Sequence, residues 1–332
     1  MLKRLFKLLL LTGLVLTGWT AWFALSPVDL PAATVDFSIV PGSGLRSATR
    51  QIHDAGVDIR PWQFNLIARV TRNQAGIKAG SYQIAEGTTP WQLLKKITSG
   101  DFSQAEISFI EGWTFRQVRA ALDAHADVRH ELGSLSDLEI MEKLGSAGAQ
   151  PEGWFFPDTY LFAKGTTDLA ILLRAHHAMQ KKLESTWADR APDSPLRSPY
   201  EALILASIVE KETGTAEDRA RIASVFLNRM RIPMRLQTDP TVIYGLGERF
   251  DGNLRKRDLL ADTPFNTYTR DGLPPTPIAM PGLAALQATL HPAKSDALYF
   301  VAKGNGASQF SRTLDEHNRA VARYQKSPRA NR

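Results

Sequence analysis

The chain has 332 residues, of which 43% are hydrophobic and 22% are charged, so it is long enough for two domains and has a globular rather than disordered composition. Its formal net charge of +6 includes no basic block that alternates with aromatic residues, which argues against a nucleic-acid partner. The absence of cysteine excludes disulfides, thiolate metal sites and cysteine nucleophiles.

The N-terminus has the pattern of a membrane anchor. Residues 1–7 are a basic stub, and the uncharged run 8–25 has about the minimum length of a transmembrane helix. Because the positive charges precede the run, we expect the stub in the cytoplasm and the rest of the chain outside it. The alternative is a signal peptide cleaved at the Ala24-Leu25-Ser26 site, but we favour the uncleaved anchor.

A pattern of strand, glycine turn and amphipathic helix occurs three times within residues 35–125. The pattern is seen in the segments 37–45, 81–94 and 106–115, and their uneven spacing excludes a solenoid. The middle copy resembles a LysM module, a small fold that binds glycans containing N-acetylglucosamine. A plain scaffold of small α+β units is the alternative.

The stretch 198–214 predicts a buried helix. Ser198 is a suitable N-cap, Pro199 fits the first helical position, Glu201 fits a capping box, and Gly214 fits a left-handed C-terminal cap. Residues 203–209 are apolar on every side except Ser207, so we expect this helix in the core.

Glu210 therefore lies in the last turn of a buried helix. Burial and the negative end of the helix dipole both raise the pKa of such a carboxyl, as a general acid requires. Glu212 lies about 200° further round the helix, so we expect it to face solvent or a basic partner. The alternative is that both glutamates are ordinary charges at a helix end.

The rest of the chain predicts an α+β domain over 150–326, followed by a disordered basic tail, 327–332. The aromatic segment 151–162 fits either a carbohydrate cleft or a hydrophobic plug. Residues 235–245 place polar groups at the start of a β-branched strand, where substrate contacts are common. The remaining predicted elements are helices at 168–187, 215–231, 283–290 and 315–325, a stiff proline-rich loop at 264–277, and a hairpin of 298–302 with 309–311.

The chain has no HExxH, P-loop or GxSxG motif. We therefore expect no metal site and no cofactor.

Four motifs, at 205–212, 235–245, 266–268 and 291–294, resemble those of the YceG-like family of endolytic murein transglycosylases. The resemblance implies a peptidoglycan lytic transglycosylase, a carbon–oxygen lyase acting on a polysaccharide, with its catalytic domain in the periplasm and its anchor in the bacterial inner membrane. Such enzymes cleave nascent glycan strands between N-acetylmuramic acid and N-acetylglucosamine, leave 1,6-anhydro ends, and are thought to terminate glycan polymerisation beside peptidoglycan synthases. The family's catalytic glutamate falls on Glu210.

We therefore expect Glu210 to act first as acid and then as base, with Gln237, Asp239, Asn266 and Tyr268 binding substrate. One alternative is a muramidase that hydrolyses the same bond. It needs a second carboxylate, for which Asp239 is the first candidate, followed by Glu152 and Asp158. The other alternative is a membrane-tethered glycan-binding scaffold without activity.

Overall fold

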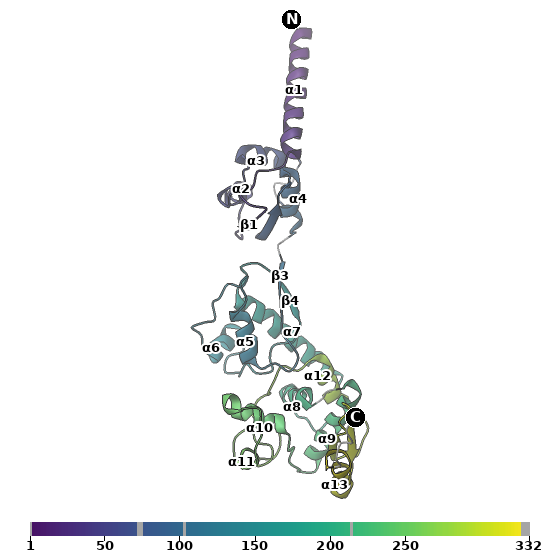
Figure 1. The fold of residues 1–332 in the computed structure, drawn as a ribbon. Coiled ribbons are helices and arrows are strands. Elements are labelled where there is room, and N and C mark those ends of the chain that lie inside the picture. Colours follow the sequence, from purple (N-terminus) through teal and green to yellow (C-terminus); the bar gives the residue numbers. More distant parts are fainter. Residues whose placement is uncertain (1, 72–75, 102–103, 213–214, 327–332) are drawn as a thin grey trace, which may run out of the picture. The chain divides into compact units, whose positions relative to one another are not determined.

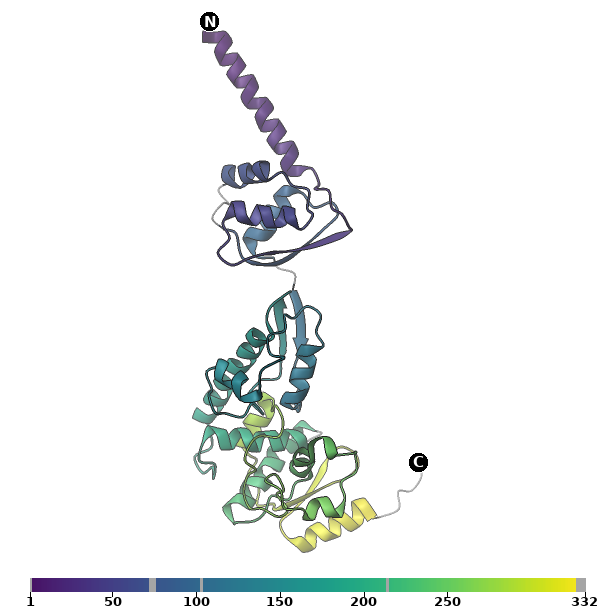
Figure 2. The same cartoon turned by 90° about the vertical axis from the view of Figure 1, so that its left-hand side faces the viewer.

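The structure, a computed structural model, describes residues 2–71, 76–101, 104–212 and 215–326. It is mostly helical, and the strands in these ranges pair into small two-stranded sheets (Figures 1 and 2). The predicted α+β class is confirmed. The chain divides into two compact units. Unit 1 comprises Met1–Glu106, Asp127–Arg129 and Leu161–Thr166, and unit 2 comprises Ile107–Ala126, His130–Tyr160 and Thr167–Arg332.

The N-terminal helix α1 spans Leu2–Leu25, so the predicted helix at 8–25 forms and begins earlier. Within the ranges that the structure describes, no helix combines the length and the apolar character required to cross a bilayer.

Unit 1 is built from two strand–turn–helix segments. Its elements after α1 are β1 (Thr34–Ile39), α2 (Leu45–Asp54), α3 (Pro61–Val70), β2 (Gly80–Ala85) and α4 (Pro90–Ser99). Strand β1 pairs antiparallel with β2, with Thr34 opposite Ala85 and Ile39 opposite Gly80. Alternate residues of β1 are buried, and they pack with α2, α3 and α4 into one core. The first two copies of the predicted pattern are confirmed.

The third copy is formed by β3 (Gln104–Ser108) and α5 (Phe115–Asp123), and β3 pairs with β4 (Thr159–Ala163). Helix α5 begins with a capping box in which Thr114 and Gln117 bond each other's backbone N–H groups. Since Ile107–Ala126 belongs to unit 2, the predicted module region 35–125 extends across the division between the units.

Unit 2 is organised around α8, whose residues Ala202–Val209 are all buried. Helices α7, α9, α10 and α12 contact α8. Beyond α5 and β4, the elements of unit 2 are α6 (Asp137–Lys143), α7 (Asp168–Ala188), α8 (Pro199–Glu212), α9 (Ala216–Arg231), α10 (Asp239–Leu246), η1 (Gly247–Arg249), α11 (Lys256–Leu260), α12 (Leu283–Leu290), β5 (Tyr299–Ala302), β6 (Ser308–Ser311), α13 (Leu314–Val321) and η2 (Ala322–Lys326).

The predicted strand within 235–245 is wrong, because Asp239–Leu246 is the helix α10. Pro240 lies in the first turn, where its fixed φ and missing N–H suit a helix. The β-branched Thr241 and Val242 are buried on that helix, so their packing outweighs their strand preference. The helix at 283–290 and the C-terminal hairpin of β5 with β6 are confirmed.

The aromatic segment 151–162 is mainly a packing element. Phe155, Phe156 and Tyr160 are buried, and the ring of Phe155 stacks on Phe115 with their centroids 5.0 Å apart. The ring of Trp154 stacks on Tyr200 in α8 at 5.9 Å. This burial favours the hydrophobic plug over a carbohydrate cleft. The basic tail 327–332 lies outside the described residues.

Candidate active site at the end of α8

Helix α8 begins as its sequence predicts. The hydroxyl of Ser198 accepts the backbone N–H of Glu201 at 3.2 Å. The Glu201 carboxylate, however, accepts the N–H of Arg197 at 2.7 Å instead of closing a capping box on Ser198. Gly214, the predicted C-terminal cap, lies outside the described residues. The buried run of α8 ends at Val209, and the last turn of the helix places Glu210 at the edge of the core.

Glu210 is half-buried, and its Oε2 accepts the backbone N–H of Gly282 at 2.9 Å. Burial raises the pKa of Glu210, and the negative charge of Glu111 raises it further. The Gly282 hydrogen bond, Arg219 and Lys211 act in the opposite direction. The direction agrees with the sequence prediction. Two of the groups that set this pKa are distant from Glu210 in sequence: Glu111, which raises it, and Gly282, which lowers it.

Gly282 is the N-cap of α12, so the N–H that reaches Glu210 lies at the positive end of that helix. A donor at this position stabilises the ionised form of Glu210. The carboxyl is thus pushed toward its neutral form by burial, while its ionised form keeps a hydrogen-bond donor. A group that alternates between acid and base needs support in both states.

Glu111 is the residue at this site that sequence reasoning missed. It precedes the turn between β3 and α5, and its Oε1 would lie 1.8 Å from a Cβ added to Gly282. Such a distance is impossible for a real Cβ, so the Glu111 carboxylate fits against the bare Cα of Gly282. The Glu-Gly-Trp sequence at 111–113 and the isolated Gly282 gave no local signal of this contact.

Glu212 lies half-buried in a separate polar cluster near Arg229, so of its two predicted surroundings, solvent or a basic partner, the structure supports the second. Its carboxylate accepts the hydroxyl of Thr238, and burial raises its pKa, while Arg229 lowers it. Asp239 adds a nearby negative charge and accepts the Tyr268 hydroxyl at 2.5 Å. Burial and this bond raise the pKa of Tyr268. The structure therefore brings the predicted residues Asp239 and Tyr268 together, beside Glu212.

The other two predicted substrate-binding residues have different surroundings. Gln237 is exposed, with φ at +48°, and its N–H donates to the carbonyl of Thr267 at 3.1 Å. Asn266 is fully buried, and its amide donates to three backbone carbonyls while its Oδ1 accepts the N–H of Tyr268. Asn266 therefore ties its loop to the C-terminal end of α11, and Gln237 remains a predicted substrate contact.

The three candidates for a second carboxylate make no described contact with Glu210. Asp239 bonds Tyr268, as above, and Asp158 is exposed. Glu152 is 6% exposed and accepts the N–H of Phe115 and, at 3.0 Å, the hydroxyl of Tyr244. Burial raises the pKa of Glu152 to about 7 against these hydrogen bonds. The carboxylate beside Glu210 is Glu111 instead.

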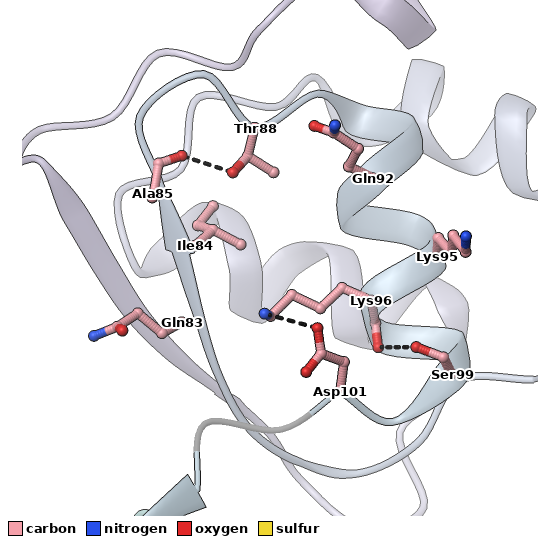
Figure 3. A pocket seen from close by; sticks show the side chains of 9 residues that line it. All are labelled: Gln83, Ile84, Ala85, Thr88, Gln92, Lys95, Lys96, Ser99 and Asp101. Carbon is pink, nitrogen blue, oxygen red and sulfur yellow. Dashed lines mark hydrogen bonds and ion pairs between the residues drawn. The ribbon is translucent and has the colours of Figure 1, made fainter.

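Unit 1 contains a separate groove of about 630 Å³ between β2 and α4 (Figure 3). Lys96 and Asp101 form an ion pair of 3.0 Å at its side, and Figure 3 shows Lys95 and Gln92 along α4. The groove has both polar and apolar walls, and it is lined in part by the segment that resembles a LysM module. Across the described ranges, no group of three or more histidine, aspartate or glutamate side chains could hold a metal ion.

Comparison with known proteins identifies the family. The model of the YceG-like family matches residues 37–323. The endolytic murein transglycosylase of Bacillus subtilis (strain 168) is 32% identical over 318 residues, which cover 90% of this chain and 88% of the relative. A protein of the same name from Streptococcus pneumoniae (strain D39) is 28% identical over 335 residues, and the match covers 91% of this chain but 60% of that longer relative.

The fold agrees with a solved relative. The crystal structure of a YceG-like protein from Listeria monocytogenes superposes with a TM-score of 0.55 at 32% sequence identity, covering 86% of this chain and 99% of that one. Both the sequence match and the structural match therefore extend over most of the chain. The resemblance predicted from the four motifs is confirmed, and the chain belongs to the YceG-like family.

Proposed function

We propose that this protein is an endolytic peptidoglycan lytic transglycosylase that uses Glu210 as its single acid and base. The observation that carries the proposal is the half-buried Glu210 carboxyl at the end of a buried helix, with its pKa raised by burial and its Oε2 on the Gly282 N–H. The names of the Bacillus and Streptococcus relatives, endolytic murein transglycosylases, support peptidoglycan as the substrate class.

In this mechanism, protonated Glu210 donates its proton to the glycosidic oxygen between N-acetylmuramic acid and N-acetylglucosamine. The bond from the muramic acid C1 to that oxygen breaks, and the sugar passes through an oxocarbenium-like state. The Glu210 carboxylate, stabilised by the Gly282 N–H, then removes the proton of the muramic acid 6-hydroxyl. Oxygen O6 bonds to C1 and closes the 1,6-anhydro ring, so Glu210 regains its proton and no water is consumed.

A muramidase is the second candidate, and the position of Glu111 favours it. Gly282 lies between the two carboxylates: its N–H bonds Oε2 of Glu210, and its Cα faces Oε1 of Glu111. Backbone geometry therefore places these two oxygens no more than about 7 Å apart. Hydrolases use a second carboxylate at about 5–5.5 Å when retaining and about 6.5–9.5 Å when inverting. Glu111 therefore replaces Asp239 as the residue that a hydrolytic mechanism would use.

Mass spectrometry of digested peptidoglycan distinguishes these reactions. We expect 1,6-anhydro-muramic acid ends, whereas a muramidase would leave reducing ends that incorporate ¹⁸O from labelled water. Glu210→Gln keeps the side-chain shape but has no carboxyl proton to donate, so it should lower the rate by at least about 100-fold. The matched control is Glu142→Gln, on an exposed face of α6.

Cleavage by Glu210→Gln at the rate of the unaltered protein would refute the assignment. Absence of cleavage by the unaltered protein, together with retention on insoluble peptidoglycan, would instead favour the non-catalytic scaffold.

We also propose that α1 holds the protein in the inner membrane, with unit 2 in the periplasm near the peptidoglycan synthases. The proposal is supported by the basic residues at 3, 4 and 7 and by large apolar side chains on α1 that are exposed. These side chains are Phe6, Leu10, Leu11, Leu14, Val15, Trp22 and Leu25.

A further inference from the structure

The turn at 111–113 is fixed against the segment that precedes α12. The N–H of Gly112 donates to the carbonyl of Met280 at 2.8 Å, and the N–H of Met280 donates to the carbonyl of Trp113 at 2.7 Å. The ammonium group of Lys211 donates to the Gly112 carbonyl at 3.3 Å. Three hydrogen bonds thus fix the backbone next to Glu111, although this turn is about 100 residues away from α8 in sequence.

Gly282 contacts both carboxylates. Its N–H bonds Glu210, while its Cα faces Glu111 so closely that a Cβ would lie 1.8 Å from Oε1. The backbone of Gly282 is extended, with φ at −78° and ψ at 172°, which any residue can adopt. A side chain at this position would therefore displace the Glu111 carboxylate without straining the backbone.

Gly112 also approaches Glu210, since a Cβ added there would lie 3.9 Å from the Glu210 Cγ. Its φ of +77° is the left-handed conformation that favours glycine. Two glycines that are distant in sequence, Gly112 and Gly282, therefore lie next to the Glu210 side chain. The Glu111 side chain occupies the space next to Gly282.

We propose that Glu111 is a positioning residue for Glu210: its carboxylate, which lies against the Cα of Gly282, repels a second negative charge and so favours the acid form of Glu210. The assignment rests on the proposed function, because it deepens the part played by Glu210 in glycan cleavage. Glu111 need not touch the sugar or transfer a proton in this arrangement.

The charges that face Glu210 come from every element around it. Glu111 from the turn before α5 opposes ionisation of Glu210, and Lys211 in α8 and Arg219 in α9 favour it. From α12, the Gly282 N–H also favours ionisation. Among these side chains Glu111 is the one carboxylate, so its neutralisation should lower the pKa of Glu210.

The expected size of the effect follows from Coulomb's law. Two unit charges about 7 Å apart change a pKa by about half a unit in a water-like dielectric, and by about 1.7 units at an effective dielectric constant near 20. Because Glu111 is exposed, we expect a value near the lower limit. High salt should reduce it further, since the Debye length at 1 M is about 3 Å.

The test combines a direct titration with activity. The full chain, labelled with ¹³C at the glutamate carboxyls, is titrated by NMR, and Glu210→Gln identifies the Glu210 signal by its loss. Glu111→Gln should lower the midpoint of Glu210 by about half a unit and move the alkaline limb of kcat/KM equally, which is about a threefold loss of rate on that limb. Glu111→Asp retains the negative charge, so the Glu210 midpoint in this variant should lie close to that of the unaltered protein.

Two further variants test whether the effect depends on the contact of Glu111 with Gly282. In Gly282→Ala the new Cβ displaces the Glu111 carboxylate but leaves the backbone N–H on Glu210, so the midpoint should fall by less than in Glu111→Gln. Glu142→Gln removes the same charge from an exposed site on α6 and should leave the midpoint unchanged.

An unchanged Glu210 midpoint in Glu111→Gln would overturn the inference whatever the activity, because the titration does not depend on turnover. Loss of activity at every pH without a change in midpoint would also overturn it, since Glu111 would then act directly. If the unaltered protein gave no anhydro product but the midpoint still fell in Glu111→Gln, the proposed function would fail while the coupling held.

Discussion

The unfolding of unit 2 should depend on pH through Glu152. This carboxyl is 6% exposed and accepts the N–H of Phe115 and the hydroxyl of Tyr244. Burial raises its pKa from 4.5 to about 7, since the hydrogen bonds only partly offset the cost of burying its charge. The substitution Glu152→Gln retains the volume and removes the titration.

The magnitude follows from linkage between protonation and folding. Below pH 4.5 Glu152 is protonated in both states, and the stability associated with its buried neutral form is fully present. Between pH 4.5 and 7 the unfolded chain releases the proton while the folded chain keeps it, so stability falls as pH rises and is lost through pH 7. A shift of about 2.5 units corresponds to about 3 kcal/mol at roughly 1.4 kcal/mol per unit.

The assay is urea unfolding from pH 4.5 to 8, with hydrogen exchange in peptides from α8 as the readout, so that unit 2 is followed by itself. The difference between the unaltered chain and Glu152→Gln isolates this residue, because Glu210 and Glu212 titrate in both. We expect the relative stability of the unaltered chain to fall by about 3 kcal/mol over this range. A difference that stays constant with pH would show that Glu152 ionises normally in the folded protein, and the reasoning from burial would be wrong.

Two more predictions test other parts of the structure. Ser207→Ala should lower the free energy of unfolding of unit 2 by about 1–3 kcal/mol, because the buried N–H of Ile278 loses its acceptor at 3.0 Å; a loss below about 0.5 kcal/mol in urea unfolding would contradict this. Deletion of residues 2–25 should release the protein from bacterial membranes that retain the full chain after a carbonate wash, and equal retention of both forms would argue against the anchor.

Local sequence signals predicted α8 and Glu210 because everything they require lies within one helix. Ser198 and Pro199 mark the start, and the apolar run to Val209 predicts burial. A carboxyl that directly follows such a run lies next to a low-dielectric core if the helix is buried, as the structure shows for α8. The direction of its pKa shift could therefore be inferred without knowledge of any partner.

The partners of Glu210 could not be predicted, because they depend on tertiary contacts. Glu111 and Gly282 lie far from Glu210 in sequence, on either side of it, and neither has a periodicity that indicates the contact. Asn266 belongs to a motif that carries the family resemblance, yet its side-chain amide bonds backbone carbonyls at the end of α11 and the N–H of Tyr268. Membership of a motif did not distinguish a side chain that faces substrate from one that shapes the backbone.

The last turn of α8 places two carboxyls in different surroundings, and the contrast supports Glu210 as the proton donor. Burial raises the pKa of both. Glu212 is engaged by the Thr238 hydroxyl and lies beside Asp239, so a proton there is held within a protein network. Glu210 accepts one backbone N–H and lies near Glu111, Lys211 and Arg219, and in its described contacts no side-chain hydroxyl donates to it, so its carboxyl remains available to a ligand. Two residues, just over half a turn of helix, thus separate a carboxyl bonded within the fold from the one that we propose as the proton donor.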